Sequence, residues 1–189
     1  MKKHRYGFIG AHTIIEEGQT SPYMFRAWIG RLRYHLFYRG DSDPDCHDHP
    51  WWFITFPLTA YVEEVIAPKL VARVEQTLAD IGESTVCPPS KAVRYLQVVP
   101  AYRFSFRSAK HTHRVVGAWT GYWITPSGWR TKHPEKYDVL EIDYEKPIRT
   151  IVFRGAIKHD WGFLKNRGTL WCWESFRRYR DGGRNAPCE

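Results

Sequence analysis

The chain has 189 residues, of which 43% are hydrophobic and 25% are charged, and these are ordinary values for one globular domain. Its aromatic content is high, with 9 Trp, 11 Tyr and 10 Phe, and such side chains suit the half-buried face of a β-sheet. The sequence has no apolar run near the ~18 residues of a membrane span, and its start lacks the apolar region of a signal peptide. We therefore expect one soluble, cytoplasmic domain over 1–189 that is not bound to a membrane.

The formal net charge is +8, with 28 Lys and Arg against 20 Asp and Glu. This balance favours an anionic partner such as a nucleotide, a nucleic acid or a carboxylate. A surface that only keeps the protein in solution explains the balance equally well, because most of the basic residues are scattered. The exception is a group near the end of the chain, formed by Arg177, Arg178, Arg180 and Arg184.

The four cysteines, Cys46, Cys87, Cys172 and Cys188, are far apart and form no CxxC pair. This spacing gives no support for a four-cysteine zinc site or a redox dithiol. We expect reduced thiols, as in other cytosolic proteins.

Residues 1–22 are expected to be irregular, and a strand is expected over 23–28. Residues 31–39 alternate with period two, which predicts a strand with one apolar face and one polar, cationic face. In an open sheet the polar face would be solvated, whereas in a barrel it would line the lumen, and the alternation fits both. The polar face carries Arg31, Arg33, His35, Phe37 and Arg39.

Two histidines one residue apart, His47 and His49, lie between a turn-prone segment and an aromatic run. Residues two apart in a strand project from the same face, so both imidazoles could reach one metal ion. The alternative is a pair of loop histidines in a chain that has 9. We expect this strand to continue to Phe56, where Pro57 marks an edge, a bulge or the strand end.

Short strands with turns between them continue along the rest of the chain, and this pattern predicts an all-β sandwich or barrel with one or two short helices. Apolar residues at helical spacing before Gly82 predict an amphipathic helix over 69–81, and a strand over 70–74 is the competing interpretation. We expect a loose, basic tail over 181–189. The later strands are expected at 61–66, 92–99, 102–107, 118–125, 137–144 and 148–154.

A second pair of histidines, His111 and His113, follows another predicted strand. An antiparallel barrel brings such distant strands together across its lumen. An early His-x-His pair, a carboxylate after it and a later histidine form the arrangement by which cupin barrels hold a divalent metal.

The chain resembles a group of small cupin-like proteins of tailed bacteriophages and bacteria that carry an HDHPW motif. The resemblance covers roughly half of the chain in islands, and Thr59-Ala60 stands where the group has two glycines. Segments 66–100 and 117–147 look like insertions. The matching segments are His35–Asp41, His47–Trp51, Tyr61–Glu63, Ala109 with His113–Val115, and Trp161–Phe163 with Trp171 and Trp173.

The resemblance implies a single cupin-like antiparallel barrel or jelly roll. It implies that His47, His49 and His113 are metal ligands, with Glu63 as a weaker fourth. Asp48 and His111 are expected to support the ligands rather than to bind the ion, although His111 is an alternative ligand. The residues expected on the substrate side are His35, Arg39, Tyr61 and Arg107, and a salt bridge to Asp41 or Asp43 is the alternative for Arg39.

Such a ligand set would leave coordination positions open, which is typical of a catalytic rather than a structural metal. We expect iron, with Zn, Mn and Ni as alternatives, in an enzyme of the oxygenase or hydroxylase type that acts on a small anionic molecule. The catalytic residues and the reaction are not predicted. The first alternative is a non-catalytic pocket that sequesters a nucleotide-like ligand, in the host cytoplasm if the chain is encoded by a phage. A weaker one is nucleic-acid binding through the basic tail, and a homodimer would suit the aromatic excess.

Overall fold

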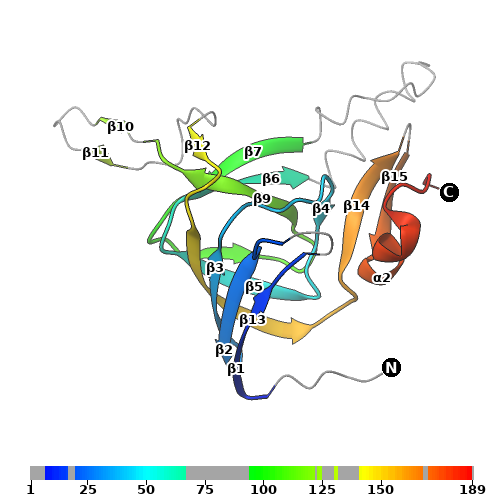
Figure 1. The fold of residues 1–189 in the computed structure, drawn as a ribbon, viewed down its shortest axis with the longest axis horizontal. Helices are drawn as coiled ribbons and strands as arrows, with labels where there is room; N and C mark the ends of the chain where they lie inside the picture. Colours follow the sequence, from blue (N-terminus) through cyan, green and yellow to red (C-terminus); the bar gives the residue numbers. More distant parts are fainter. Residues whose placement is uncertain are drawn as a thin grey trace.

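The protein is an all-β molecule built from two antiparallel sheets, as the computed structural model in Figure 1 shows. The helix expected over 69–81, the competing strand over 70–74 and about half of the 117–147 segment lie outside the described residues. No helix among the described residues is long and apolar enough to span a membrane. The structure describes residues 7–16, 20–66, 94–121, 123–124, 130–131, 141–167 and 170–188.

The first sheet has the strand order β1-β2-β3-β13-β5-β8, and all its neighbouring strands are antiparallel. Its members are β1 (Ile9–Ile14), β2 (Met24–Ile29), β3 (Leu32–Phe37), β13 (Ile148–Ile157), β5 (Trp51–Pro57) and β8 (Ser105–Arg107).

The second sheet has the order β15-β14-β4-β9-β6-β7, and a short strand β12 (Ile142–Asp143) also pairs with β9. A separate two-stranded ribbon, β10 (Trp123–Ile124) and β11 (Arg130–Thr131), projects from the body in Figure 1. The six strands of the main order are β15 (Leu170–Ser175), β14 (Gly162–Arg167), β4 (Cys46–His47), β9 (Thr112–Trp119), β6 (Tyr61–Ile66) and β7 (Arg94–Val99).

The chain crosses between the two sheets repeatedly, because β3, β5, β8 and β13 belong to the first sheet while β4, β6, β9 and β14 belong to the second. This alternation is the connectivity of a jelly roll, in which the buried faces of two sheets enclose the core. The fold class is therefore the expected cupin-like, mainly β architecture.

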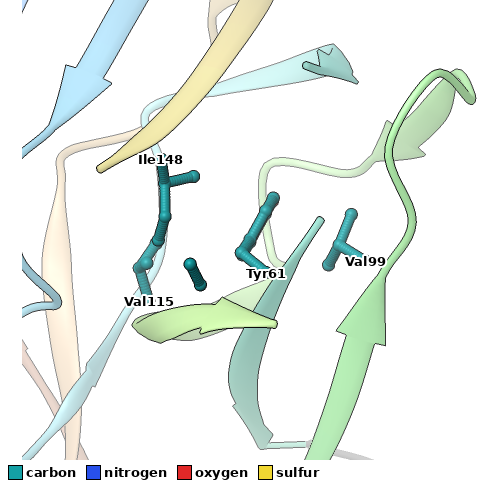
Figure 2. Close-up of a cluster of buried hydrophobic side chains, with 5 residues drawn as sticks. Tyr61, Val99, Val115 and Ile148 are labelled. Carbon is teal, nitrogen blue, oxygen red and sulfur yellow. The ribbon is translucent and has the colours of Figure 1, made fainter. Parts of the chain in front are cut away.

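The core between the sheets is formed by alternate residues of several strands. Tyr61, Val99, Val115, Ala118 and Ile148 form one buried cluster, which Figure 2 shows where β6, β7 and β9 meet the start of β13. These residues come from positions 61 to 148, so the cluster ties the two sheets together over a long sequence separation.

The polar face of β3 is buried rather than solvated, and this decides between the two interpretations of its alternating sequence. Arg33 is 6% exposed, whereas Leu32 on the opposite face is 44% exposed. Arg33 and His35 share their face with Thr150 and Val152, which are buried on the neighbouring strand β13. The polar residues of this strand therefore face the interior between the sheets.

Two expectations about local structure are wrong. The region before residue 22 is not irregular, because residues 9–14 form β1 and pair in register with β2. The HDHPW segment is not one strand either: β4 ends at His47 in the second sheet and β5 begins at Trp51 in the first. The chain crosses between the sheets in the three residues that separate these strands. Pro57 is the last residue of β5, so it marks a strand end.

The expectations for the cysteines and the tail also need correction. Cys172 and Cys188 form a disulfide, while Cys46 is a buried free thiol. The tail over 181–188 is held against β14, because the Lys165 ammonium donates hydrogen bonds to the carbonyl oxygens of Gly183 and Ala186. A helical turn α2 (Phe176–Arg178) leads into a second turn η2 (Tyr179–Gly183), which includes the start of this tail, beside β14 and β15 (Figure 1).

Candidate metal centre

Three histidines converge between the sheets. His47 and His113 are cross-strand partners on β4 and β9, so both project from the same face of the second sheet. His49 comes from the crossing segment, and its ring centroid lies 5.1 Å from that of His47 and 5.2 Å from that of His113. The crossing, rather than strand parity, brings the pair from HDHPW together. One nitrogen from each of the three rings lies within 4.8 Å of the others.

The distance between His49 and His113 fits two ligands of one ion. Their Nε2 atoms are 3.0 Å apart. Metal–nitrogen distances of about 2.0–2.1 Å allow two nitrogens at this separation to bind one ion. The same separation is that of a hydrogen bond between the two rings.

Glu63 stands behind His113. This glutamate has no exposed surface, and its Oε2 lies 2.8 Å from His113 Nδ1. An imidazole that binds a metal through Nε2 carries its proton on Nδ1, and a carboxylate that accepts this proton in a hydrogen bond fixes the tautomer and the ring orientation. Glu63, His111 and His113 also form a second group of potential ligands, which would use Nδ1 of the same ring. Glu63 is thus in contact with His113, and its role as a fourth ligand stays a prediction.

The Glu63 carboxylate has further partners. Arg107 Nη2 donates to Oε1 at 2.7 Å, and the Gln97 amide also donates to Oε1. His111 Nε2 lies 3.4 Å from Oε1, at ion-pair distance but without hydrogen-bond geometry. Burial by itself would raise the pKa of Glu63, but the neighbouring His113, His111 and Arg107 outweigh it and hold the pKa well below its usual range. The carboxylate is therefore ionised.

Burial favours the neutral form of His47 and His49. It lowers the pKa of His47 to about 4, against the opposing influence of Asp41. The pKa of His49 is also well below its usual value, mainly through burial and then through His47 and His113. A neutral imidazole has a free lone pair on one nitrogen, which is the form that binds a metal.

Asp48 holds the crossing segment in place through its carboxylate. Its carboxylate accepts a hydrogen bond from the backbone N–H of Gly162 and another from Trp173 Nε1, each at 2.9 Å. Burial raises the pKa of Asp48, although these two donors act in the other direction. The contacts join the segment between His47 and His49 to β14 and β15.

The four residues expected on the substrate side lie in different surroundings. His35 is on the interior face of β3, whereas Arg39 is paired with Glu16 at 2.6 Å rather than with Asp41 or Asp43. Tyr61 is part of the buried cluster of Figure 2, and burial followed by the charge of Glu63 raises its pKa. Arg107 is engaged by Glu63. His35 is therefore the expected residue best placed to meet a ligand.

The structure adds other basic residues to this interior face. Arg33 and Arg154 both lie over the indole ring of Trp51, with the guanidinium carbon 6.0 Å and 4.9 Å from the ring centroid. Trp51 is itself next to the centre, because its ring is 6.4 Å from that of His49. Only Arg33 had a sequence signal, the alternation over 31–39, whereas the position of Arg154 depends on strand pairing.

The comparisons with known proteins add one structural similarity. No protein-family model matches the chain, and no curated protein matches it significantly. Among solved structures the chain is similar to the DMSP lyase DddQ from Ruegeria pomeroyi DSS-3, with 13% sequence identity and a TM-score of 0.32. The match covers 81% of this chain and 50% of that one, so the chain spans half the length of that protein. The fold and the site described above define a cupin-like β protein with a His/Glu cluster that could hold a divalent metal ion.

Proposed function

We propose that this chain is a metal-dependent enzyme that binds a divalent ion through His47, His49 and His113 and acts on a small anionic molecule. The observation that carries the proposal is the 3.0 Å approach of the His49 and His113 Nε2 atoms at a point where a third imidazole converges. Burying three polar rings together is costly unless their nitrogens find partners, and a metal ion supplies a partner to all three.

A catalytic role is supported by the number of protein ligands. Three histidines leave at least one coordination position open, whereas a structural zinc site is closed by four protein ligands. A divalent ion in such a site can act as a Lewis acid or lower the pKa of a bound water. The Glu63 carboxylate accepts a hydrogen bond from His113 Nδ1, and Asp48 keeps the segment with His49 in position.

Iron is the metal that we propose, in an oxygenase or hydroxylase. Imidazole nitrogens suit iron and nickel as well as zinc. Zinc, manganese and nickel are the alternatives. A redox-active metal would separate this proposal from a lyase or hydrolase that works with zinc.

The test is elemental analysis of the purified protein together with histidine variants. His47→Ala and His49→Ala should each lose bound metal while keeping the circular dichroism spectrum of the wild type. His12→Ala is the matched control, because His12 lies on β1, pairs with β2 and belongs to neither group of potential metal ligands. A wild-type protein that binds no iron, zinc, manganese or nickel after reconstitution would refute the proposal.

A non-catalytic pocket for a nucleotide-like ligand is the second candidate. The arrangement of Arg33 and Arg154 around Trp51 favours it, since cations beside an aromatic ring suit a ligand with a phosphate and a flat ring. This candidate predicts tight nucleotide binding by metal-free protein with no turnover in any metal-loaded form.

Nucleic-acid binding through the tail receives less support. Three of the four arginines near the end of the chain are close to carboxylates: Arg177 lies 3.8 Å from Asp181, Arg178 lies 3.5 Å from Glu174, and Arg184 lies 3.5 Å from Asp43. The homodimer stays a prediction.

A further inference from the structure

We propose that the interior face of the first sheet is the subsite that binds the anionic group of the substrate, a carboxylate or a phosphate. This inference extends the proposed function and rests on it in one respect, namely that the bound anion is a substrate. We call this surface the cationic face, and it consists of His12, Arg26, Arg33, His35 and Arg154.

Strand register brings the members of the cationic face together. His12 on β1 is opposite Arg26 on β2, and Arg26 is opposite His35 on β3. Directly paired residues of antiparallel strands project from the same face of the sheet. Since His35 shares a face with the buried Thr150 of β13, the whole row His12–Arg26–His35 lies on the interior side.

A second part of the cationic face surrounds Trp51. Arg154 is opposite Phe53 of β5, and Phe53 is buried, so Arg154 also projects to the interior side. Its guanidinium lies over the Trp51 ring at 4.9 Å, and that of the buried Arg33 lies at 6.0 Å from the same ring. Two guanidinium groups from different strands thus meet at one indole.

Repulsion within the cationic face favours an incoming anion. The pKa of His35 is well below its usual value, first because of burial and then because of Arg26 and Arg33. Within the described part of the chain, His35 Nε2 and Arg154 Nε are buried and form no hydrogen bond. The described residues also place no carboxylate in an ion pair with Arg154. An oxyanion would supply hydrogen-bond acceptors to His35 Nε2 and Arg154 Nε and so offset the cost of burying them without a partner.

The position of Trp51 connects the cationic face to the metal centre. Trp51 follows His49 by two residues, and the two rings are 6.4 Å apart. The Phe53 ring lies 4.8 Å from His49 on the same side. A small molecule could therefore reach the histidine nitrogens with one end, cross the aromatic rings, and place an anionic group against Arg33 or Arg154. This arrangement selects a compact organic anion rather than a polymer.

The other arginines that the sequence suggested do not compete for this role. Arg39 is neutralised by Glu16 at 2.6 Å, and Arg107 by Glu63 at 2.7 Å. Their carboxylate partners would have to be displaced before either could bind a substrate anion. Arg154, which the described residues place in no ion pair, carries the electrostatic attraction instead.

Calorimetric titration of the full chain with two probes, inorganic phosphate and succinate, tests the subsite. Arg154→Gln and Arg26→Gln should each weaken the binding of at least one probe by about tenfold or more, as expected for the loss of a charge-assisted hydrogen bond. Arg149→Gln is the matched control, because Arg149 lies on the same strand as Arg154 but on its exposed face. The control should bind both probes as the wild type does.

The comparison of the probes tells which oxyanion is preferred, since phosphate and carboxylate present different shapes to the same guanidinium groups. Wild-type protein that binds neither probe would overturn the inference. So would folded Arg154→Gln and Arg26→Gln variants that bind both probes with unchanged affinity. Metal content measured on the same samples keeps the two proposals apart: loss of metal binding with intact, arginine-dependent anion binding refutes the proposed enzyme and supports the subsite.

Discussion

Replacing Glu63 by glutamine changes the charge behind the metal centre without changing the volume of the side chain. In the wild type, one carboxylate oxygen accepts from His113 Nδ1 and the other accepts from Arg107 and Gln97. A glutamine has only one acceptor oxygen, so its NH₂ group must face one of these donors. If it faces His113, the ring must protonate on Nε2 instead and loses the lone pair that would bind the metal.

The size of the effect follows from these contacts. The loss of a carboxylate that supports a metal-bound histidine weakens metal affinity by about 10- to 100-fold, which is about 1.4–2.8 kcal/mol. If the amide faces Arg107 instead, a buried ion pair is broken, and we expect a destabilisation of about 3 kcal/mol. Because Glu63 has no exposed surface, water cannot restore either interaction at this position.

The assay is a competition titration of Zn²⁺ or Co²⁺ against a chelator, with urea unfolding of the metal-free protein alongside. Glu64→Gln is the matched control, since Glu64 is the next residue of β6, projects to the opposite face and pairs with Arg114. We expect the control to keep its metal affinity and to lose about 1 kcal/mol or less. A folded Glu63→Gln protein with wild-type metal affinity would refute the reasoning. A loss as large as that of His47→Ala would instead make Glu63 a direct ligand.

Three further predictions follow from other parts of the structure. Burial, followed by the charge of Glu64, raises the pKa of the Cys46 thiol to about 12. Iodoacetamide at pH 8 should therefore leave Cys46 unmodified in the folded protein and modify it in urea, as measured by peptide mapping that distinguishes it from the other cysteines. Rapid labelling of Cys46 in the native state would contradict this prediction. Cys172→Ser should lower the free energy of unfolding in urea by about 3 kcal/mol, because the Cys172–Cys188 disulfide closes a loop with a sequence separation of 16. The control is the reduced wild-type protein, whose free energy of unfolding should fall by the same amount. Folding lowers the pKa of His35, mainly through burial, so the unfolded chain takes up a proton on this ring at a higher pH than the folded protein does. The stability of the metal-free protein should therefore fall as the pH decreases below about 6.5. His35→Gln should make this pH dependence shallower. An unchanged pH dependence in His35→Gln would show that the ring does not stay neutral in the fold.

Much of the candidate site could be predicted from the sequence because its residue types and spacings are local properties. Period-two alternation over 31–39 marked a polar face, and the HDHPW segment marked two histidines that could share an ion. The choice of His113 over His111 came from a resemblance, and the structure makes His113 the cross-strand partner of His47. These features could be predicted because the alternation of side chains along a strand and the metals that a residue type binds depend little on the rest of the chain.

The tertiary structure decided which faces meet and which charges neutralise each other. Local periodicity does not tell whether the polar face of β3 meets water or the interior, since that depends on the second sheet. It also does not tell that Arg39 pairs with Glu16, or that Arg154 lies over Trp51. These pairs are distant in sequence, and strand order and register bring them together. The sequence alone thus determined the type of chemistry, and the pairing of distant strands decided where that chemistry is placed.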